Sequence, residues 1–249
     1  LEIAKAFENK AIEVNATLVL AEIYRDSGNS PRAIDNFLNA YDLAVHSQDP
    51  DSQELALTNL GRLYLDRGWA ERAAQCYRQA LESLEEVANK AAILGSLGLC
   101  MAELGAFEDA INYFRTASLE AELEEDLASM AVCVGSEGNV LFELREYERA
   151  LACYQKALSL ARKIEDKAGI GAWLGNTGTT FDKLKRSDEA VNALEEALEL
   201  AIESGDKHSQ AAHLDSLGDC LSSSGRFDEA KAKYEEALQI SRSIEDRFG

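Results

Sequence analysis

Residues of the types that usually do chemistry occur in this sequence, but their spacing does not assemble a site. The three histidines, His46, His208 and His213, lie at no metal-ligand spacing from a cysteine or from one another. The stretch from Gly169 to Gly175 is similar to a dinucleotide-binding fingerprint, but its spacing is off by one residue and no strand pattern precedes it. Gly-x-Ser-x-Gly and phosphate-loop motifs do not occur. We therefore expect no enzyme activity, no catalytic residues, no cofactor and no metal, although the abundant carboxylates leave carboxylate catalysis open.

The cysteines favour a reducing compartment over a disulfide framework. They form an odd, scattered set without a Cys-x-x-Cys pair: Cys76, Cys100, Cys133, Cys153 and Cys220. The first ten residues carry charges and lack the apolar core of a signal peptide. No apolar run is long enough to cross a bilayer. We expect a cytoplasmic protein that does not insert into a membrane.

Composition and charge restrict the partners. The 249 residues are 46% hydrophobic, which is enough to bury a core, and the formal net charge is −20. Such an acidic field repels nucleic acid and anionic lipid. It favours basic partners, or it serves solubility alone.

The clearest pattern is an internal repeat in six copies. One alanine column has spacings of 40, 37, 40, 40 and 40 residues: Ala33, Ala73, Ala110, Ala150, Ala190 and Ala230. Four residues later stands a large residue and seven later another alanine, so these positions share one face of a helix. Twelve residues before each alanine stands a small residue: Ala21, Gly61, Gly98, Gly138, Gly178 and Gly218. Because glycine within a helix costs about 1 kcal/mol against alanine, its recurrence indicates close approach of a neighbouring helix.

A turn separates the two helices of each copy. Glycine stands at this turn in four copies, at Gly28, Gly68, Gly105 and Gly225, and suits a left-handed helix end. Arg145 and Lys185 replace it in the other two, a strain of about 1 kcal/mol each if the geometry is kept. A single helix pair cannot cover its own apolar face, whereas stacked pairs can, which predicts a solenoid.

This pattern resembles the tetratricopeptide repeat family over essentially the whole chain. The resemblance implies an all-α, right-handed superhelical solenoid of antiparallel helix pairs. Glu137 and Thr177 depart from the family pattern at its leucine position, and Leu194 departs at the aromatic position of the second helix. The long repeats, of about 40 residues, are similar to those of Partner of Inscuteable polarity adaptors and of bacterial scaffold proteins. The predicted repeats are 14–53, 54–90, 91–130, 131–170, 171–210 and 211–249.

The ends and one shortened repeat carry further expectations. Residues 1–13 align with the end of a second helix, and no polar capping helix is evident, so we expect a segment of a longer array. Three residues are missing between Tyr77 and Gly98, which predicts a local change of superhelix curvature.

In this family the first helix of each repeat lines a concave groove, and the resemblance implies which residues contact a partner there. They are Thr58, Arg62, Leu65, Gly95, Leu99, Gly135, Asn139, Phe142, Gly175, Thr179, Lys183, Asp215 and Asp219. The glycines of this set recur at one position in three successive repeats. They leave room for a partner backbone, or they allow tighter packing of neighbouring helices, and both readings stay open.

The chemistry of this predicted groove varies along the chain. Leu99 and Phe142 make its middle apolar while its ends are charged, which suits a peptide or helix anchor. Asp215 and Asp219 lie one turn apart and either meet a basic residue of a partner or face solvent. The family members that grip a terminal carboxylate use lysine, arginine and asparagine at these positions. Here only Arg62 and Asn139 would suit, so that ligand is disfavoured.

Two further residues have alternative interpretations. Glu137 is either a functional contact or, as we favour, part of a rotated or locally exposed helix, because a buried carboxylate is costly unless paired. Trp173 is either a binding anchor or, as we favour, a packing residue between repeats.

The sequence thus predicts a protein-interaction scaffold that binds a peptide or helix of a basic or amphipathic partner in the groove. Two alternatives remain, a regulatory sensor domain of a larger signalling protein or enzyme, and an architectural spacer in a large assembly. The sequence leaves the identity of the partner and the oligomeric state open.

Overall fold

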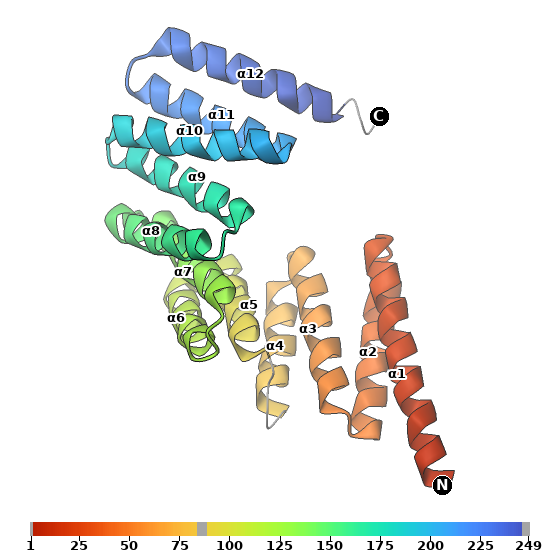
Figure 1. Ribbon diagram of the computed structural model, residues 1–249. Helices are drawn as coiled ribbons and strands as arrows, with labels where there is room; N and C mark the ends of the chain where they lie inside the picture. Colours follow the sequence, from red (N-terminus) through yellow and green to blue (C-terminus); the bar gives the residue numbers. More distant parts are fainter. Residues whose placement is uncertain (1, 84–88, 246–249) are drawn as a thin grey trace. The chain divides into compact units, whose positions relative to one another are not determined.

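The computed structural model describes residues 2–83 and 89–245, and this part of the chain consists of helices joined by short turns (Figure 1). The helices are α1 (Glu2–Asp26), α2 (Ser30–Ser47), α3 (Pro50–Asp66), α4 (Ala70–Ser83), α5 (Lys90–Glu103), α6 (Phe107–Leu123), α7 (Leu127–Glu143), α8 (Tyr147–Lys163), α9 (Lys167–Lys183), α10 (Ser187–Ser204), α11 (Lys207–Ser223) and α12 (Phe227–Glu245). These ranges contain no strand, which confirms the predicted all-α class. None of the described helices is long and apolar enough to span a bilayer.

Side-chain caps determine where several helices begin. The Asp126 carboxylate accepts hydrogen bonds from the backbone N–H groups of Ala128 at 3.1 Å and Ser129 at 3.0 Å. These donors have no partner within the helix, so the cap satisfies them. The hydrogen bonds from Ser129 hold the pKa of Asp126 below its usual range. Asp206 caps α11 in the same way, and Pro50 stands at the first position of α3.

Left-handed residues end many of the helices. Arg145 and Lys185 adopt φ values of 61° each, so both keep the geometry that glycine has in the other copies. The glycines at these turns, at 28, 68, 105 and 225, have φ between 71° and 80°. Three turns between consecutive pairs also use non-glycine residues with positive φ, at Gln48, Glu125 and Glu165. The sequence pattern did not predict these three.

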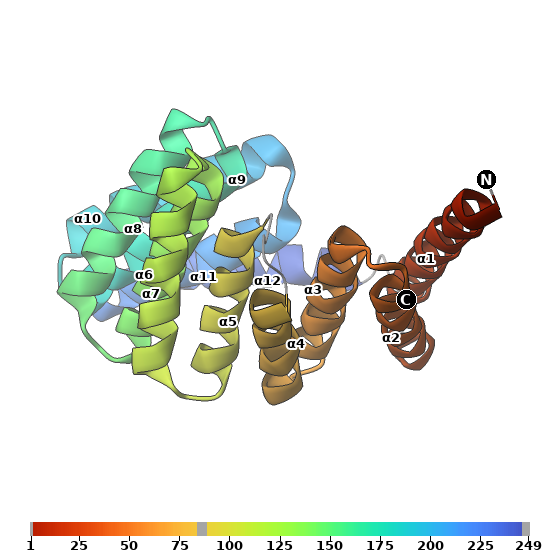
Figure 2. The same cartoon turned by 90° about the horizontal axis from the view of Figure 1, so that it is seen from below.

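The N-terminal unit comprises residues 1–120. In it, α1 packs on α2 and α3 on α4, and successive pairs meet through α2 with α3 and α4 with α5 (Figure 2). Helix α1 runs through residues 13 and 14 without a turn, so the predicted boundary there has no counterpart in the helix structure. The missing residues between Tyr77 and Gly98 fall partly on residues 84–88, outside the described ranges, and the predicted change of curvature stays a prediction.

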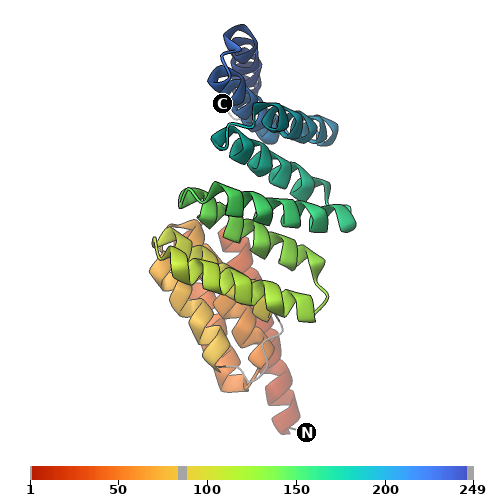
Figure 3. The same cartoon turned by 90° about the vertical axis from the view of Figure 1, so that its left-hand side faces the viewer.

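The C-terminal unit comprises residues 121–249. Its pairs are α7 with α8, α9 with α10 and α11 with α12, and successive pairs meet through α8 with α9 and α10 with α11. Figure 3 shows these pairs from the side, passing from green to blue along the chain. The first helices α9 and α11 also contact each other. The pairs begin slightly before the predicted repeat boundaries, for example at Leu127 rather than 131, because residue columns fix a repeat length but not the first turn of a helix.

The alanine and glycine columns form the core, as predicted. The alanines of the first column are at most 2% exposed. A methyl carbon added at any glycine of the second column would lie 2.5–2.8 Å from a side chain of the second helix of the same pair. The contacts join Gly61 with Tyr77, Gly98 with Phe114, Gly138 with Tyr154, Gly178 with Leu194, and Gly218 with Tyr234. Close helix approach therefore explains the glycines.

Candidate partner-binding surface

In the N-terminal unit, the predicted contact residues lie on α3 and α5. Arg62 and Leu99 are exposed, each one position after the buried glycine of its helix. Thr58, Leu65 and Gly95 are half-buried beside them. This unit thus presents a cation on α3 and an apolar side chain on α5 at equivalent positions.

In the C-terminal unit, Asn139 is exposed but engaged by neighbouring helices. Its Oδ1 atom accepts hydrogen bonds from the Tyr154 hydroxyl at 2.9 Å and from the Asn176 side-chain amide at 3.2 Å. The half-buried Phe142 ring packs edge-on against Tyr147, with ring centroids 5.3 Å apart. Substituting Asn139 or Phe142 would therefore disturb packing as well as any partner contact.

Two members of the predicted glycine row are covered by the next first helix. A methyl carbon at Gly135 would lie 2.2 Å from Cη2 of Trp173, and one at Gly175 would lie 2.7 Å from Cε1 of His213. Both glycines are buried. The Trp173 ring also stacks on Tyr154, with centroids 6.3 Å apart. Packing between repeats therefore accounts for Gly135, Gly175 and Trp173, as the second reading of the glycine row proposed. Burial lowers the pKa of His213, which keeps its imidazole neutral over Gly175.

Thr179 and Lys183 lie on α9 next to a buried acid. The Thr179 hydroxyl donates to the Gly175 carbonyl at 3.0 Å. Lys183 is exposed, and its Nζ is 3.9 Å from Oδ2 of Asp182. Asp182 is itself buried and accepts a hydrogen bond from the Ser223 hydroxyl of α11. Lys183 is therefore an exposed cation beside the contact between Asp182 and Ser223 of α11.

Asp215 and Asp219 are both exposed on α11, one turn apart. The Tyr234 hydroxyl donates to Oδ1 of Asp219 at 2.7 Å. This hydrogen bond raises the pKa of Tyr234 to about 12, with burial as a lesser cause. Asp215 faces solvent on the same helix, so α11 presents negative charge.

Glu137 differs from the favoured expectation. We expected a rotated or locally exposed helix at this position, but Glu137 is only 9% exposed. It has an interaction partner in the fold. Helix α7 therefore turns the same face to the core as the other first helices, and the Glu137 carboxylate lies inside the repeat.

No disulfide joins the five cysteines, and four of them are buried. Burial raises the pKa of the Cys76, Cys100 and Cys133 thiols to about 11. Such thiols are protonated near neutrality and react slowly. Among the residues that the structure describes, no group of three or more His, Cys, Asp or Glu side chains could hold a metal ion.

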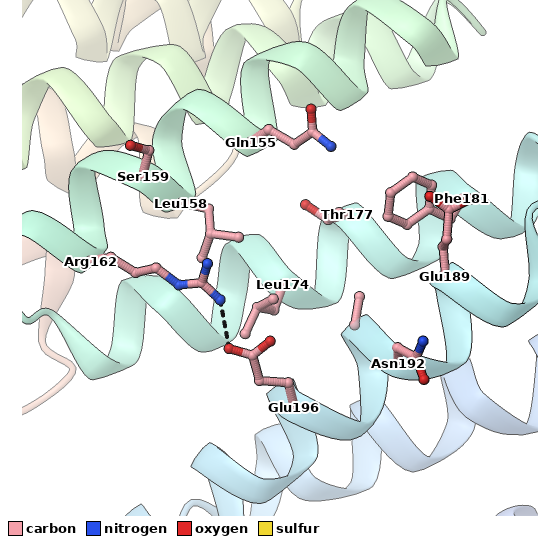
Figure 4. Close-up of a pocket in the computed structure, with 11 residues that line it drawn as sticks. Gln155, Leu158, Ser159, Arg162, Leu174, Thr177, Phe181, Glu189, Asn192 and Glu196 are labelled. Atoms are coloured by element: carbon pink, nitrogen blue, oxygen red, sulfur yellow. Dashed lines mark hydrogen bonds and ion pairs between the residues drawn. The ribbon is translucent and has the colours of Figure 1, made fainter.

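A hollow that the sequence analysis did not predict lies in the C-terminal unit. Its volume is about 510 Å³, and its walls come from α8 and α10 with α9 between them (Figure 4). The lining residues are Gln155, Leu158, Ser159, Arg162, Leu174, Thr177, Phe181, Glu189, Asn192, Ala193 and Glu196. None belongs to the predicted groove set. The available signal was Thr177, a polar residue at a leucine position of the repeat.

These features define a helical-repeat protein built from stacked antiparallel pairs. Family models described as tetratricopeptide repeat match residues 13–86, 127–203 and 183–243, and another with the same description matches 58–121. The chain belongs to the tetratricopeptide repeat family, a family of protein-interaction scaffolds. A comparison with curated protein sequences finds no match.

Solved structures share the fold at low sequence identity. BtubC from P. vanneervenii is 18% identical over 96% of this chain and 92% of that chain, with a TM-score of 0.68. Aspartyl phosphate phosphatase F from Bacillus subtilis is 16% identical over 97% of this chain and 74% of that chain, with a TM-score of 0.74. The apo form of RapI is 22% identical over 78% and 72% of the two chains, with a TM-score of 0.71. At these identities the likeness shows the fold, and the phosphatase name describes that protein alone.

Proposed function

We propose that this chain binds a peptide or helix of a partner protein through the exposed residues of its first helices. The observation that carries the proposal is the contrast between neighbouring positions of those helices. The glycine column is buried and nearly uniform, while the position after it is exposed or half-buried and chemically varied: Arg62, Leu99, Asn139, Thr179 and Asp219. A constant frame with a variable surface is what a recognition module needs, because the frame fixes geometry and the surface fixes specificity.

The charge of the chain supports a basic or amphipathic partner. The formal net charge is −20, and α11 contributes Asp215 and Asp219 on one exposed face. An acidic surface attracts a basic segment and speeds its encounter, and it repels nucleic acid. We propose that a basic residue of the partner lies near α11.

The test uses peptides selected from a displayed random library against the full chain. Binding of the selected peptides is then measured for Asp215→Ala and for Lys183→Ala. Lys156→Ala is the matched control, because Lys156 is an exposed charge on the second helix α8. We expect Asp215→Ala to weaken a basic peptide about tenfold and Lys156→Ala to leave it unchanged. Equal affinities for all three variants would exclude the first-helix surface as the site.

A further inference from the structure

Helix α1 carries a stripe of exposed aliphatic side chains. Ile12, Val19, Leu20 and Ile23 are between 46% and 65% exposed. Their spacing places them on one side of the helix, away from the buried Ala21. Within its unit α1 packs beside α2 (Figure 1). Large aliphatic side chains that gather on one exposed face mark an interaction surface, whereas single exposed ones need no explanation.

Two positions of this stripe are buried in the other first helices. Leu20 directly precedes Ala21 of the glycine column, and Ile23 follows it by two residues. The equivalent residues of the other first helices are at most 9% exposed: Leu60, Leu97, Glu137, Thr177 and Leu217 before the glycine, and Leu63, Cys100, Val140, Thr180 and Cys220 after it. In α11, Leu217 and Cys220 form one core cluster with Ala190 and Leu194 of the preceding second helix α10. The two positions therefore belong to the interface between consecutive pairs, and in α1 they lie open.

Helix α12 leaves the opposite half of the same interface open. Tyr234 occupies the position of Leu194 and is half-buried. The equivalent residues of the other second helices are at most 3% exposed: Phe37, Tyr77, Phe114, Tyr154 and Leu194. Phe227 and Leu238 of α12 are 69% and 50% exposed. Together with Ala230 and Tyr234 they line a hollow of about 360 Å³. This apolar hollow lies where the other second helices are covered.

One residue beside the hollow departs from the pattern of the second helices. Lys231 is exposed and directly follows Ala230 of the alanine column. The other second helices carry apolar residues at this position: Ile34, Ala74, Ile111, Leu151 and Val191. The Lys231 stem can cover apolar surface while its ammonium group stays in water. Lys231 therefore weakens packing on α12 without preventing it, and it indicates a reversible contact rather than a permanent one.

We propose that a second copy of this chain covers these surfaces, with α1 of one copy packed on α12 of the next. Leu20 and Ile23 would lie against Ala230 and Tyr234, in the arrangement that joins α11 to α10. The contact is heterologous, because each copy offers two different faces and keeps one of them open after pairing. Assembly therefore continues beyond the dimer. None of these residues belongs to the predicted groove set, so self-association is independent of peptide binding.

The charge of the chain sets the salt dependence of this contact. The formal net charge of −20 opposes the approach of two copies. Helix α1 itself is close to neutral, since residues 10–26 contain three acidic residues, Glu13, Glu22 and Asp26, and two basic residues, Lys10 and Arg25. Salt screens the repulsion between whole chains and leaves the apolar contact intact. Self-association should thus strengthen with added salt, whereas binding of a basic peptide should weaken.

The first experiment measures the mass of the full chain by analytical ultracentrifugation at increasing protein concentration. We expect the average mass to rise past that of a dimer. Ile23→Asp should weaken the association at least about tenfold, because it places a charge in the apolar contact. Ile202→Asp is the matched control and should change nothing, since Ile202 of α10 is 58% exposed and Ile23 is 56% exposed. Lys231→Leu restores the apolar column and should tighten the association about tenfold.

A mixing experiment tests which faces meet. Ile23→Asp and Phe227→Asp should each be monomeric alone, with circular dichroism equal to that of the parent chain. Mixed together they should form a dimer of one copy of each, because one variant keeps an intact α12 and the other an intact α1. A dimer that survives Phe227→Asp would overturn the proposal and indicate contact between two α1 helices. A monomer mass at every concentration, for both the parent chain and Lys231→Leu, would overturn self-association altogether.

Discussion

Helices α9 and α11 are the first helices of consecutive repeats and both have 17 residues, but they carry different residues at equivalent positions. Helix α11 has Leu217 in the core and α9 has Thr177. The left-handed residue after the end of α11 is Gly225, whereas Lys185 takes the same conformation after the end of α9. The repeat of α9 therefore keeps the same helix packing with a polar core residue and a strained turn residue. A hollow lies beside this helix.

The largest effect is expected from making α11 resemble α9. Leu217→Thr removes apolar volume from a residue that is 1% exposed and adds a buried hydroxyl. Both changes destabilise, and we expect a loss of about 3 kcal/mol in the free energy of unfolding. Urea unfolding followed by circular dichroism measures it. A loss below about 1 kcal/mol would mean that the leucine position carries little of the core energy.

The second-largest effect is expected from substituting the core glycines of the two helices, Gly178 of α9 and Gly218 of α11. A methyl group at Gly178 would meet Cγ of the fully buried Leu194 at 2.6 Å and the backbone oxygen of Ala190 at 3.1 Å. At Gly218 it would lie 2.5 Å from the Tyr234 ring, which is half-buried, whereas Leu194 is fully buried. We expect Gly178→Ala to destabilise by about 2 kcal/mol and Gly218→Ala by about 1 kcal/mol, because a half-buried ring shifts at lower cost than a fully buried leucine and the backbone at Ala190. Equal unfolding midpoints of the two variants would contradict this account.

The unpaired Thr177 hydroxyl in α9 predicts a smaller effect, a gain in the free energy of unfolding when it is removed. Thr177→Val removes an unsatisfied buried polar group without changing the shape, so it should stabilise by about 1 kcal/mol. Thr180→Val removes a satisfied hydroxyl and should not stabilise the chain. Thermal unfolding of both variants checks this, and a loss of stability in Thr177→Val would show that the hydroxyl has a partner within the fold.

The turns after the two helices should respond with opposite signs. Lys185→Gly removes the strain of a side chain at a left-handed backbone position and should raise the free energy of unfolding by about 1 kcal/mol. Gly225→Ala should lower it by a similar amount. Arg145→Gly at the end of α7 should behave like Lys185→Gly. Chemical unfolding of the three variants measures these changes. A destabilised Lys185→Gly would show that the lysine makes contacts worth more than the strain.

The smallest effect concerns pH. Trp173 of α9 and His213 of α11 occupy equivalent positions over glycines, but only the histidine titrates. Burial lowers the folded-state pKa of His213 below its value of 6.5, so the unfolded chain binds the proton more readily. Its contribution to stability is present above about pH 6.5 and is lost as the pH falls through the lowered value. His213→Gln should show a shallower loss of stability between pH 6.5 and 5 than the parent chain, in unfolding measured across that range.

The sequence predicted the fold well because repeated columns report packing directly. The glycines at 61, 98, 138, 178 and 218 mark close helix approach, and each indeed lies against a second-helix side chain. The site was less predictable. Spacing placed Gly135 and Gly175 on a predicted contact face, but it does not show that Trp173 and His213 from the next helix reach over them. Likewise, Glu137 is buried, because the fold supplies it with a partner that a single repeat pattern does not reveal.

The central claim is that the first helices carry the recognition surface. It is tested most directly by adding a selected peptide to the isotopically labelled chain and mapping the amide NMR shifts. The account predicts perturbations centred on exposed first-helix residues such as Lys183 and Asp215, with Lys156 of α8 unaffected. Shifts centred on the second helices, with Lys183 and Asp215 unperturbed, would contradict it.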